Sequence, residues 1–144
     1  GESGGEAEPL EWVDIRIGLT ASIPEEYVSH VSQRLDLYRR LASARDEEEI
    51  KNILSHIADR FGPLPEQVET LAEESRIRIS LSLKGVLSVQ KVGDYLEIIL
   101  RESRDETVNR FTSLGFIQTK PNKLTLEVKN KRPENLLKIL SRLV

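Results

Sequence analysis

The residue types that most often do chemistry are sparse in this sequence of 144 residues. It has two histidines, His30 and His56, and no cysteine. The histidines fall on different predicted helices, and neither has the His-x-x-x-His or Glu-x-x-His spacing that would place two metal ligands on one helix face. The sequence also lacks a Gly-x-x-x-x-Gly-Lys-Ser/Thr phosphate loop, a Gly-x-Gly-x-x-Gly turn and a Gly-x-Ser-x-Gly nucleophile elbow. We therefore predict that the chain is not an enzyme and holds no cofactor or metal ion.

A run of four carboxylates, Asp46-Glu47-Glu48-Glu49, can be interpreted in two ways. The run could form a carboxylate-rich active site, but it also stands where an amphipathic helix is predicted to begin. Asp46 is a favourable N-cap residue, and Glu49 three residues later completes a box-like capping signal. Negative charge is also favourable at the positive end of the helix dipole. Stabilisation of the helix start is therefore the preferred interpretation.

The helix that follows presents a polar face that is a candidate partner-binding site. Its apolar stripe includes Ile50, Leu54, Ile57 and Phe61, and Gly62-Pro63 ends it. On a helical wheel with 100° per residue, the opposite face carries five polar side chains: Asn52, Ser55, His56, Asp59 and Arg60. A carboxylate, a guanidinium and an imidazole thus lie within two turns. The alternative is that this face only meets solvent.

A cluster of basic residues suggests nucleic acid as a second class of partner. Acidic residues are in excess over residues 1–85, whereas basic residues are in excess over residues 86–144. The cluster lies in or beside a predicted hairpin and consists of Lys120, Lys123, Lys129, Lys131 and Arg132. Such side chains could contact phosphates, but Tyr95 and Phe116 are too few aromatic residues for a base-stacking platform. Solvated lysines that protect a sheet edge are the preferred explanation, and a nucleic-acid-binding module using the basic half is the alternative function.

The elements that would position these residues fall into two groups. Alternation over residues 13–17 predicts a strand, and apolar residues at three- and four-residue steps predict a helix over residues 29–44, with Val31, Leu35, Tyr38 and Ala42 on its apolar face. A third helix is predicted from Pro65 to near Gly85, with one face formed by Val68, Leu71, Ala72, Ser75 and Ile79. Three helices with short connections would pack as an antiparallel bundle.

The second group has the order ββαββα. Gly93-Asp94 separates two predicted strands at residues 86–92 and 95–100, and residues 120–123 separate two more. Ser103-x-x-Glu106 resembles a capping box for the helix between the hairpins, and Pro133 opens a final helix. The sequence predicts an α+β fold, in which this unit forms a four-stranded, mainly antiparallel sheet with two helices on one face.

The predicted organisation is one domain preceded by a linker. Residues 1–12 are interpreted as a flexible linker and residues 13–144 as a single domain, with a helical half at 13–85 and a ββαββα half at 86–144. The sequence contains no methionine, which favours a C-terminal piece of a longer protein over a processed start followed by a tail. No apolar run approaches the roughly 20 residues that span a membrane, and no secretory signal is present. We expect a cytoplasmic monomer without membrane contact.

Three segments carry a resemblance to a known family. Ala21-Ser-Ile-Pro-Glu-Glu-Tyr-Val28 is similar to an A-x-I-P-x-x-Y-I segment, residues 34–42 are similar to RLxxYKRLA, and residues 59–71 are similar to DRFGPLPxxVxxL. These three motifs occur, in this order, in the C-terminal domain of the bacterial transcription-repair coupling factors, which this sequence therefore resembles. The resemblance covers residues 13–84, while the ββαββα half carries no matching signature.

The resemblance implies a regulatory function. Members of this family are DNA translocases that remove stalled RNA polymerase and recruit the excision-repair machinery. Their last domain is noncatalytic, docks on the UvrB-like N-terminal module of the same protein and covers the surface that binds UvrA. The family interface involves the end of the helix before Arg-Phe-Gly, which implies Asp59 as a contact residue. A carboxylate often stands one turn earlier, where this sequence has His56. The leading hypothesis is an autoinhibitory interaction domain.

Overall fold

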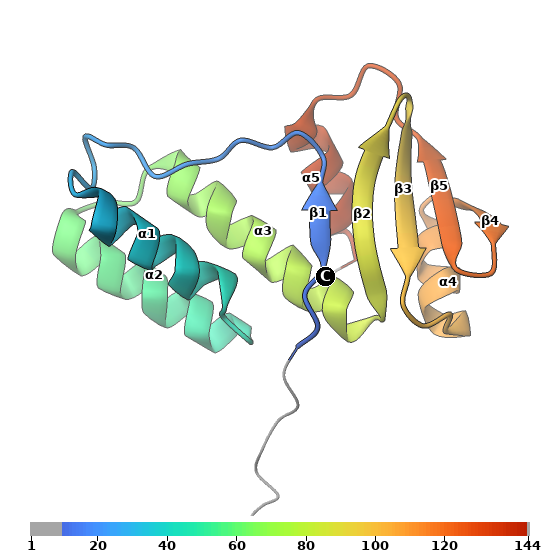
Figure 1. Ribbon diagram of the computed structural model, residues 1–144, viewed down its shortest axis with the longest axis horizontal. Helices are drawn as coiled ribbons and strands as arrows, with labels where there is room; N and C mark the ends of the chain where they lie inside the picture. The colour runs from blue at the N-terminus through green and yellow to red at the C-terminus, as the bar shows by residue number, and fades with distance from the viewer. Residues whose placement is uncertain (1–9, 144) are drawn as a thin grey trace, which may run out of the picture.

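The structure is a computed structural model that describes residues 10–143 (Figure 1). The prediction of a flexible linker falls largely on residues 1–9, which lie outside the described residues. The elements in chain order are β1 (Asp14–Arg16), α1 (Val31–Ala42), α2 (Glu47–Phe61), α3 (Glu66–Leu83), β2 (Val86–Val92), β3 (Tyr95–Leu100), α4 (Asp105–Ser113), β4 (Ile117–Lys120), β5 (Lys123–Glu127) and α5 (Pro133–Ser141). The predicted α+β class, with a strand and three helices followed by a ββαββα unit, is confirmed.

The helical region is built around α2 and α3, with α1 packed on both. Its core contains Ile50, Ile53 and Ile57 from α2 together with Val68 and Ala72 from α3. The predicted stripe of α2 therefore forms the inner face of that helix. Because burying each such aliphatic side chain contributes about 1.5–3 kcal/mol, this face determines how α2 is oriented.

The buried face of α1 differs from the prediction. Leu37 and Leu41 point into the core, whereas Val31 is 61% exposed, Leu35 is 47% exposed and Ala42 is also exposed. Two overlapping apolar stripes run along this helix at three- and four-residue spacing. The Leu37/Leu41 pair buries more apolar area than a stripe that ends in alanine, so it faces α2 and α3.

The central helix α3 contributes to both hydrophobic cores of the molecule. Its Val68 and Ala72 pack in the helical core, while Ile77 and Leu81 pack against the sheet. The prediction included only the first of these faces. The sheet core also includes Val13 and Ile17, so it extends across the predicted division between residues 85 and 86.

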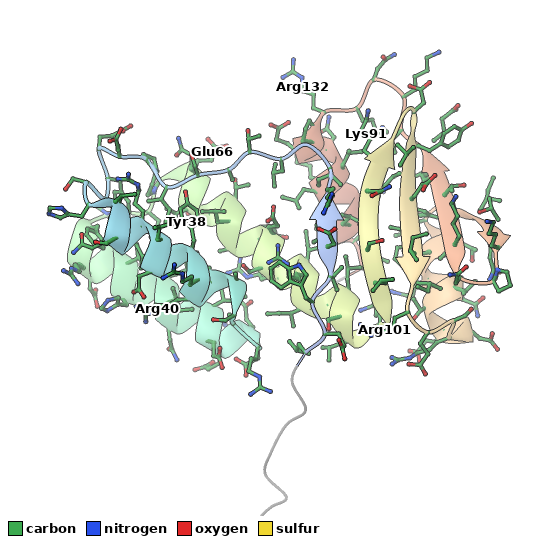
Figure 2. All side chains as sticks on the ribbon, viewed as in Figure 1. Tyr38, Arg40, Glu66, Lys91, Arg101 and Arg132 are labelled. Atoms are coloured by element: carbon green, nitrogen blue, oxygen red, sulfur yellow. The ribbon has the colours of Figure 1, made fainter. Side chains whose placement is uncertain are left out.

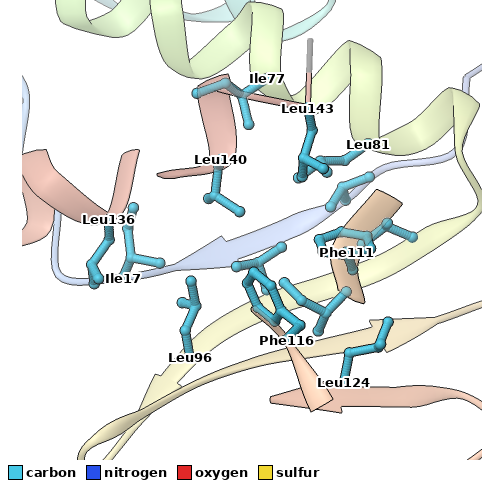
Figure 3. Packing of buried hydrophobic residues seen from close by; sticks show 14 of the residues in the cluster. Ile17, Ile77, Leu81, Leu96, Phe111, Phe116, Leu124, Leu136, Leu140 and Leu143 are labelled. Carbon is cyan, nitrogen blue, oxygen red and sulfur yellow. The ribbon is translucent and has the colours of Figure 1, made fainter. Parts of the chain in front are cut away.

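The sheet has five strands in the order β1-β2-β3-β5-β4, one more than predicted for the ββαββα unit. The additional strand is β1, which pairs parallel to β2 with Ile15 opposite Val89. The other pairings are antiparallel. Helices α4 and α5 and the end of α3 cover one face, where Phe111, Leu140 and Leu81 pack against the strands (Figure 3).

Two predicted helix caps have different outcomes. The Asp46 carboxylate accepts a hydrogen bond from the Glu49 backbone N–H at 2.9 Å, which confirms the start of α2. The prediction of a capping box at Ser103 is wrong, because the N-cap residue of α4 is Arg104, whose side chain makes no capping hydrogen bond. The Ser103 hydroxyl instead donates to the Pro121 carbonyl at 2.7 Å, so it joins α4 to the second hairpin.

Candidate partner-binding face on α2

The five predicted site residues lie on the outer face of α2, opposite the core. All five side chains are exposed, whereas Ile53 and Ile57 on the inner face are buried. Since α2 has about 3.6 residues per turn, the five positions occupy adjacent rows over roughly two turns. They form one continuous polar surface, which we call the α2 face: Asn52, Ser55, His56, Asp59 and Arg60.

The polar side chains of the α2 face make few contacts with the rest of the domain. Within residues 10–143, none of the five takes part in an ion pair or a side-chain hydrogen bond. The face has two parts. His56 and Arg60 line a shallow groove of about 260 Å³ together with Asp36 and Arg40 of α1, whereas the other three residues do not. The polar groups of the α2 face can therefore engage a partner without first breaking an ion pair or a side-chain hydrogen bond inside the described part of the chain.

The C-terminal end of α2 is held in place by aromatic contacts. The Arg60 guanidinium lies 5.4 Å from the centroid of the Phe61 ring, and that ring lies 5.9 Å from the ring of Tyr27. The Tyr27 hydroxyl donates to the Gly62 carbonyl at 2.6 Å, and burial raises the pKa of that hydroxyl. These contacts join the loop before α1 to the end of α2, so the α2 face is presented on a rigid support.

Sequence reasoning missed the supporting role of Tyr27. This residue precedes Gly62 by 35 positions, and helical periodicity cannot reveal a contact across that distance. The available signal was its place in the segment that resembles A-x-I-P-x-x-Y-I.

The structure divides the predicted basic cluster between two ends of the sheet. Lys123 begins β5, whereas Lys129 follows the opposite end of that strand, and a strand of this length spans roughly 17 Å. Figure 2 shows Arg132 and Lys91 near one end of the sheet and Arg101 near the other. The five side chains therefore do not form one patch, and the nucleic-acid alternative stays an untested prediction.

The two histidines belong to different helices, as predicted. His30 is the N-cap residue of α1 and His56 lies in the middle of α2. In the part of the chain that the structure describes, no group of three or more His, Cys, Asp or Glu side chains is placed to hold a metal ion. No described helix combines the length and apolar character needed to cross a membrane.

A second surface lies where the sequence predicted only linker. Trp12 is 56% exposed and lies beside a groove between residues 10–12, α1 and α3. In the sequence, the groove was marked only by a single tryptophan next to a predicted strand. Such a residue does not by itself indicate a binding groove.

Comparison with protein-family models shows which family the chain belongs to. The model of the TRCF domain family matches residues 17–111, which include all three helices of the helical region. This chain belongs to the TRCF domain family. The match ends within α4, so the second hairpin and α5 of this TRCF domain lie outside it.

Similar proteins and a solved structure agree with this assignment. The transcription-repair-coupling factor of Escherichia coli (strain K12) is 26% identical over 114 residues, covering 79% of this chain and 10% of that protein. That of Staphylococcus haemolyticus (strain JCSC1435) is 30% identical over 122 residues, covering 83% and 10%. The TRCF domain thus spans about a tenth of the length of these relatives. A crystal structure of the C-terminal domain of transcription-repair coupling factor has the same fold, with a TM-score of 0.74, 19% identity and coverage of 92% of this chain and 89% of that one.

Proposed function

We propose that this TRCF domain is a noncatalytic, autoinhibitory module of a transcription-repair coupling factor. It docks through the α2 face on the UvrB-like N-terminal module of the same protein and covers the surface that binds UvrA. The observation that carries this proposal is the α2 face itself, whose five polar side chains are exposed and make no ion pair or side-chain hydrogen bond within residues 10–143. Membership of the TRCF domain family supports the choice of partner.

The geometry of α2 suits docking as a rigid body. The helix is capped by Asp46 at its start and supported through Phe61 and Tyr27 at its end. Little of the α2 backbone therefore has to become ordered when a partner binds, which lowers the entropic cost of association. The carboxylate of Asp59 and the guanidinium of Arg60 would pair with opposite charges, and truncating one side of a buried charged contact typically costs about 2 kcal/mol or more.

Docking within one polypeptide permits a weak and reversible contact. Tethering gives two modules an effective concentration that can reach the millimolar range. An interface with modest intrinsic affinity would then stay closed most of the time, and a change in the motor could still release it. We also propose that the docked domain helps to hold the translocase motor of the same protein in a low-activity state. Release would then uncover the UvrA-binding surface and raise the activity of the motor.

The proposal is tested in the full-length protein with the Asp59→Ala/Arg60→Ala variant. We expect stronger UvrA binding and a higher motor ATPase rate than in the wild type, with domain stability changed by less than about 1 kcal/mol. Lys91→Ala/Asp94→Ala is the matched control, because it removes one cation and one carboxylate from the exposed β2–β3 hairpin. A folded Asp59→Ala/Arg60→Ala protein that binds UvrA no better than the wild type would overturn the proposal.

Two measurements on the isolated chain separate this function from other classes. Nucleotide hydrolysis that copurifies with the chain would contradict a noncatalytic module. Binding to duplex DNA that weakens steeply with salt would favour the nucleic-acid alternative, because phosphate contacts release counterions. We expect neither.

A further inference from the structure

Trp12 is the single tryptophan of the sequence, and the structure holds it in a defined position. The Arg78 guanidinium of α3 lies 4.2 Å from the centroid of the indole ring. The hydroxyl of Ser82, one turn further along α3, donates to the Glu11 carbonyl at 2.7 Å. One side of the indole is therefore packed on α3, although 56% of the residue stays exposed.

A groove of about 550 Å³ lies beside Trp12, bounded by residues 10–12, the end of α1 and the middle of α3. Its apolar lining residues are Leu10, Trp12, Ala42, Ala44 and Ile79. Exposed apolar surface of this kind, next to an aromatic side chain with restricted motion, is typical of sites that bind other proteins.

The exposed apolar surface continues from the groove along α1. Leu35 precedes Ala42 by seven residues, which places both on one side of the helix, and Val31 lies one turn before Leu35. Val31 and Leu35 are 61% and 47% exposed. Both belong to the stripe that the sequence predicts for the core, but of that stripe only Tyr38 packs against the core, because Leu37 and Leu41 occupy it.

The charges around the groove are mainly positive. Arg39, Arg45 and Arg78 line it, and Glu11 is the one carboxylate among its lining residues. Arg78 is paired with Glu74 at 3.2 Å. The Arg39 guanidinium makes no ion pair or hydrogen bond with any residue from 10 to 143, so it can pair with a carboxylate of a partner.

We propose that this groove is a docking site for an acidic peptide segment that carries a bulky apolar side chain. The apolar side chain lies between Trp12, Ala42 and Ile79, and a flanking carboxylate pairs with Arg39. Tryptophan and arginine are the residue types that contribute most to interface affinity when they become desolvated. The groove shares no lining residue with the α2 face, so this site is independent of the docking proposed above.

Trp12 provides a direct test, because its fluorescence is the only indole signal of the chain and reports on this groove. The intact chain is titrated with the blocked hexapeptide Glu-Glu-Leu-Phe-Glu-Glu. Two counterparts are used for comparison: Lys-Lys-Leu-Phe-Lys-Lys, which reverses the charge, and Glu-Glu-Ser-Ser-Glu-Glu, which removes the apolar anchor. We expect a saturable change in fluorescence below about 1 mM with the first peptide alone.

Charge reversal on α1 identifies the contact. Arg39→Glu should weaken binding of the acidic peptide at least about tenfold. Arg40→Glu is the matched control, because Arg40 is adjacent in sequence but lines the α1–α2 groove instead, and it should leave the affinity unchanged. Peptide binding measured by calorimetry keeps the test valid if the fluorescence change is small.

Three results of the peptide titrations would overturn the proposal. The acidic peptide could fail to bind, the basic peptide could bind equally well, or Arg39→Glu and Arg40→Glu could have the same effect. Fluorescence that changes with protein concentration alone, together with a dimer in sedimentation, would show that a second copy of the chain occupies the groove and would also contradict the proposal.

Discussion

The sheet region and the helical region both pair surface charges within the chain, whereas the α2 face does not. On the sheet side, Lys123 of β5 pairs with Glu97 of β3 at 3.5 Å, and Arg104 pairs with Glu102 at 2.8 Å. On the helical side, Arg76 of α3 pairs with Glu47 of α2 at 2.8 Å, and Arg78 pairs with Glu74 at 3.2 Å. The charged groups of the α2 face have no such partner within residues 10–143. The charges of the α2 face therefore stay available to another surface, whereas the paired charges of both regions are satisfied within the chain.

The two surfaces that we propose as binding sites lie mainly on the helical region. The family model covers the entire helical region and ends within α4, whereas the solved structure matches 92% of the chain in fold. Helix α3 attaches the helical region to the sheet region, because it contributes side chains to both cores. The surfaces proposed for partners, the α2 face and the Trp12 groove, are formed mainly by α1, α2 and α3.

The strongest expected effect comes from removing one aliphatic side chain in each core. Ile57→Ala in the helical core and Ile98→Ala in the sheet core should each lower the free energy of unfolding by about 2–5 kcal/mol, because both residues are fully buried. Since α3 belongs to both cores, each variant should shift one common transition in urea, followed by circular dichroism and by Trp12 fluorescence. Two separate transitions would show that the regions unfold independently.

A smaller effect distinguishes the two predicted helix caps. Asp46→Ala should cost about 1 kcal/mol, because it leaves the Glu49 backbone N–H without its capping acceptor. Ser103→Ala should cost only about 0.5 kcal/mol, because it removes one exposed hydrogen bond to Pro121 and no cap. Equal losses in thermal denaturation would mean that Ser103 supports the start of α4 after all.

The smallest effect concerns the Glu102–Arg104 pair of the sheet region. The Arg104 guanidinium, which donates to the Glu102 carboxylate, lowers the pKa of that carboxylate below its ordinary value of 4.5. An acid with a lowered pKa stabilises the fold above its unfolded pKa, and this contribution is lost as the pH falls through the folded pKa. Carbon-13 NMR titration should show the Glu102 midpoint below 4.5 in the wild type and nearer to it in Arg104→Gln. An unchanged midpoint in the variant would show that another group causes the shift.

Local patterns predicted the parts of the fold that depend on neighbouring residues. The cap and stripe of α2, the two hairpins and the exposure of the α2 face follow from spacing within one element. The prediction of which side of α1 is buried was wrong, because α1 carries two apolar stripes of similar spacing. Only packing against α2 and α3 decides which stripe is buried. The pairing of Ile15 with Val89 joins segments far apart in the chain, and the groove at Trp12 requires three such segments, so neither has a local signal.

Direct binding of the isolated chain to the UvrB-like N-terminal module tests the central claim most closely. In isothermal titration calorimetry, the wild-type chain should bind this module, and Asp59→Ala/Arg60→Ala should weaken binding at least about tenfold, or about 1.4 kcal/mol. The Lys91→Ala/Asp94→Ala control on the sheet region should bind as the wild type does. Equal affinity of the wild type and Asp59→Ala/Arg60→Ala, with both proteins folded, would contradict the assignment of the α2 face as the docking surface.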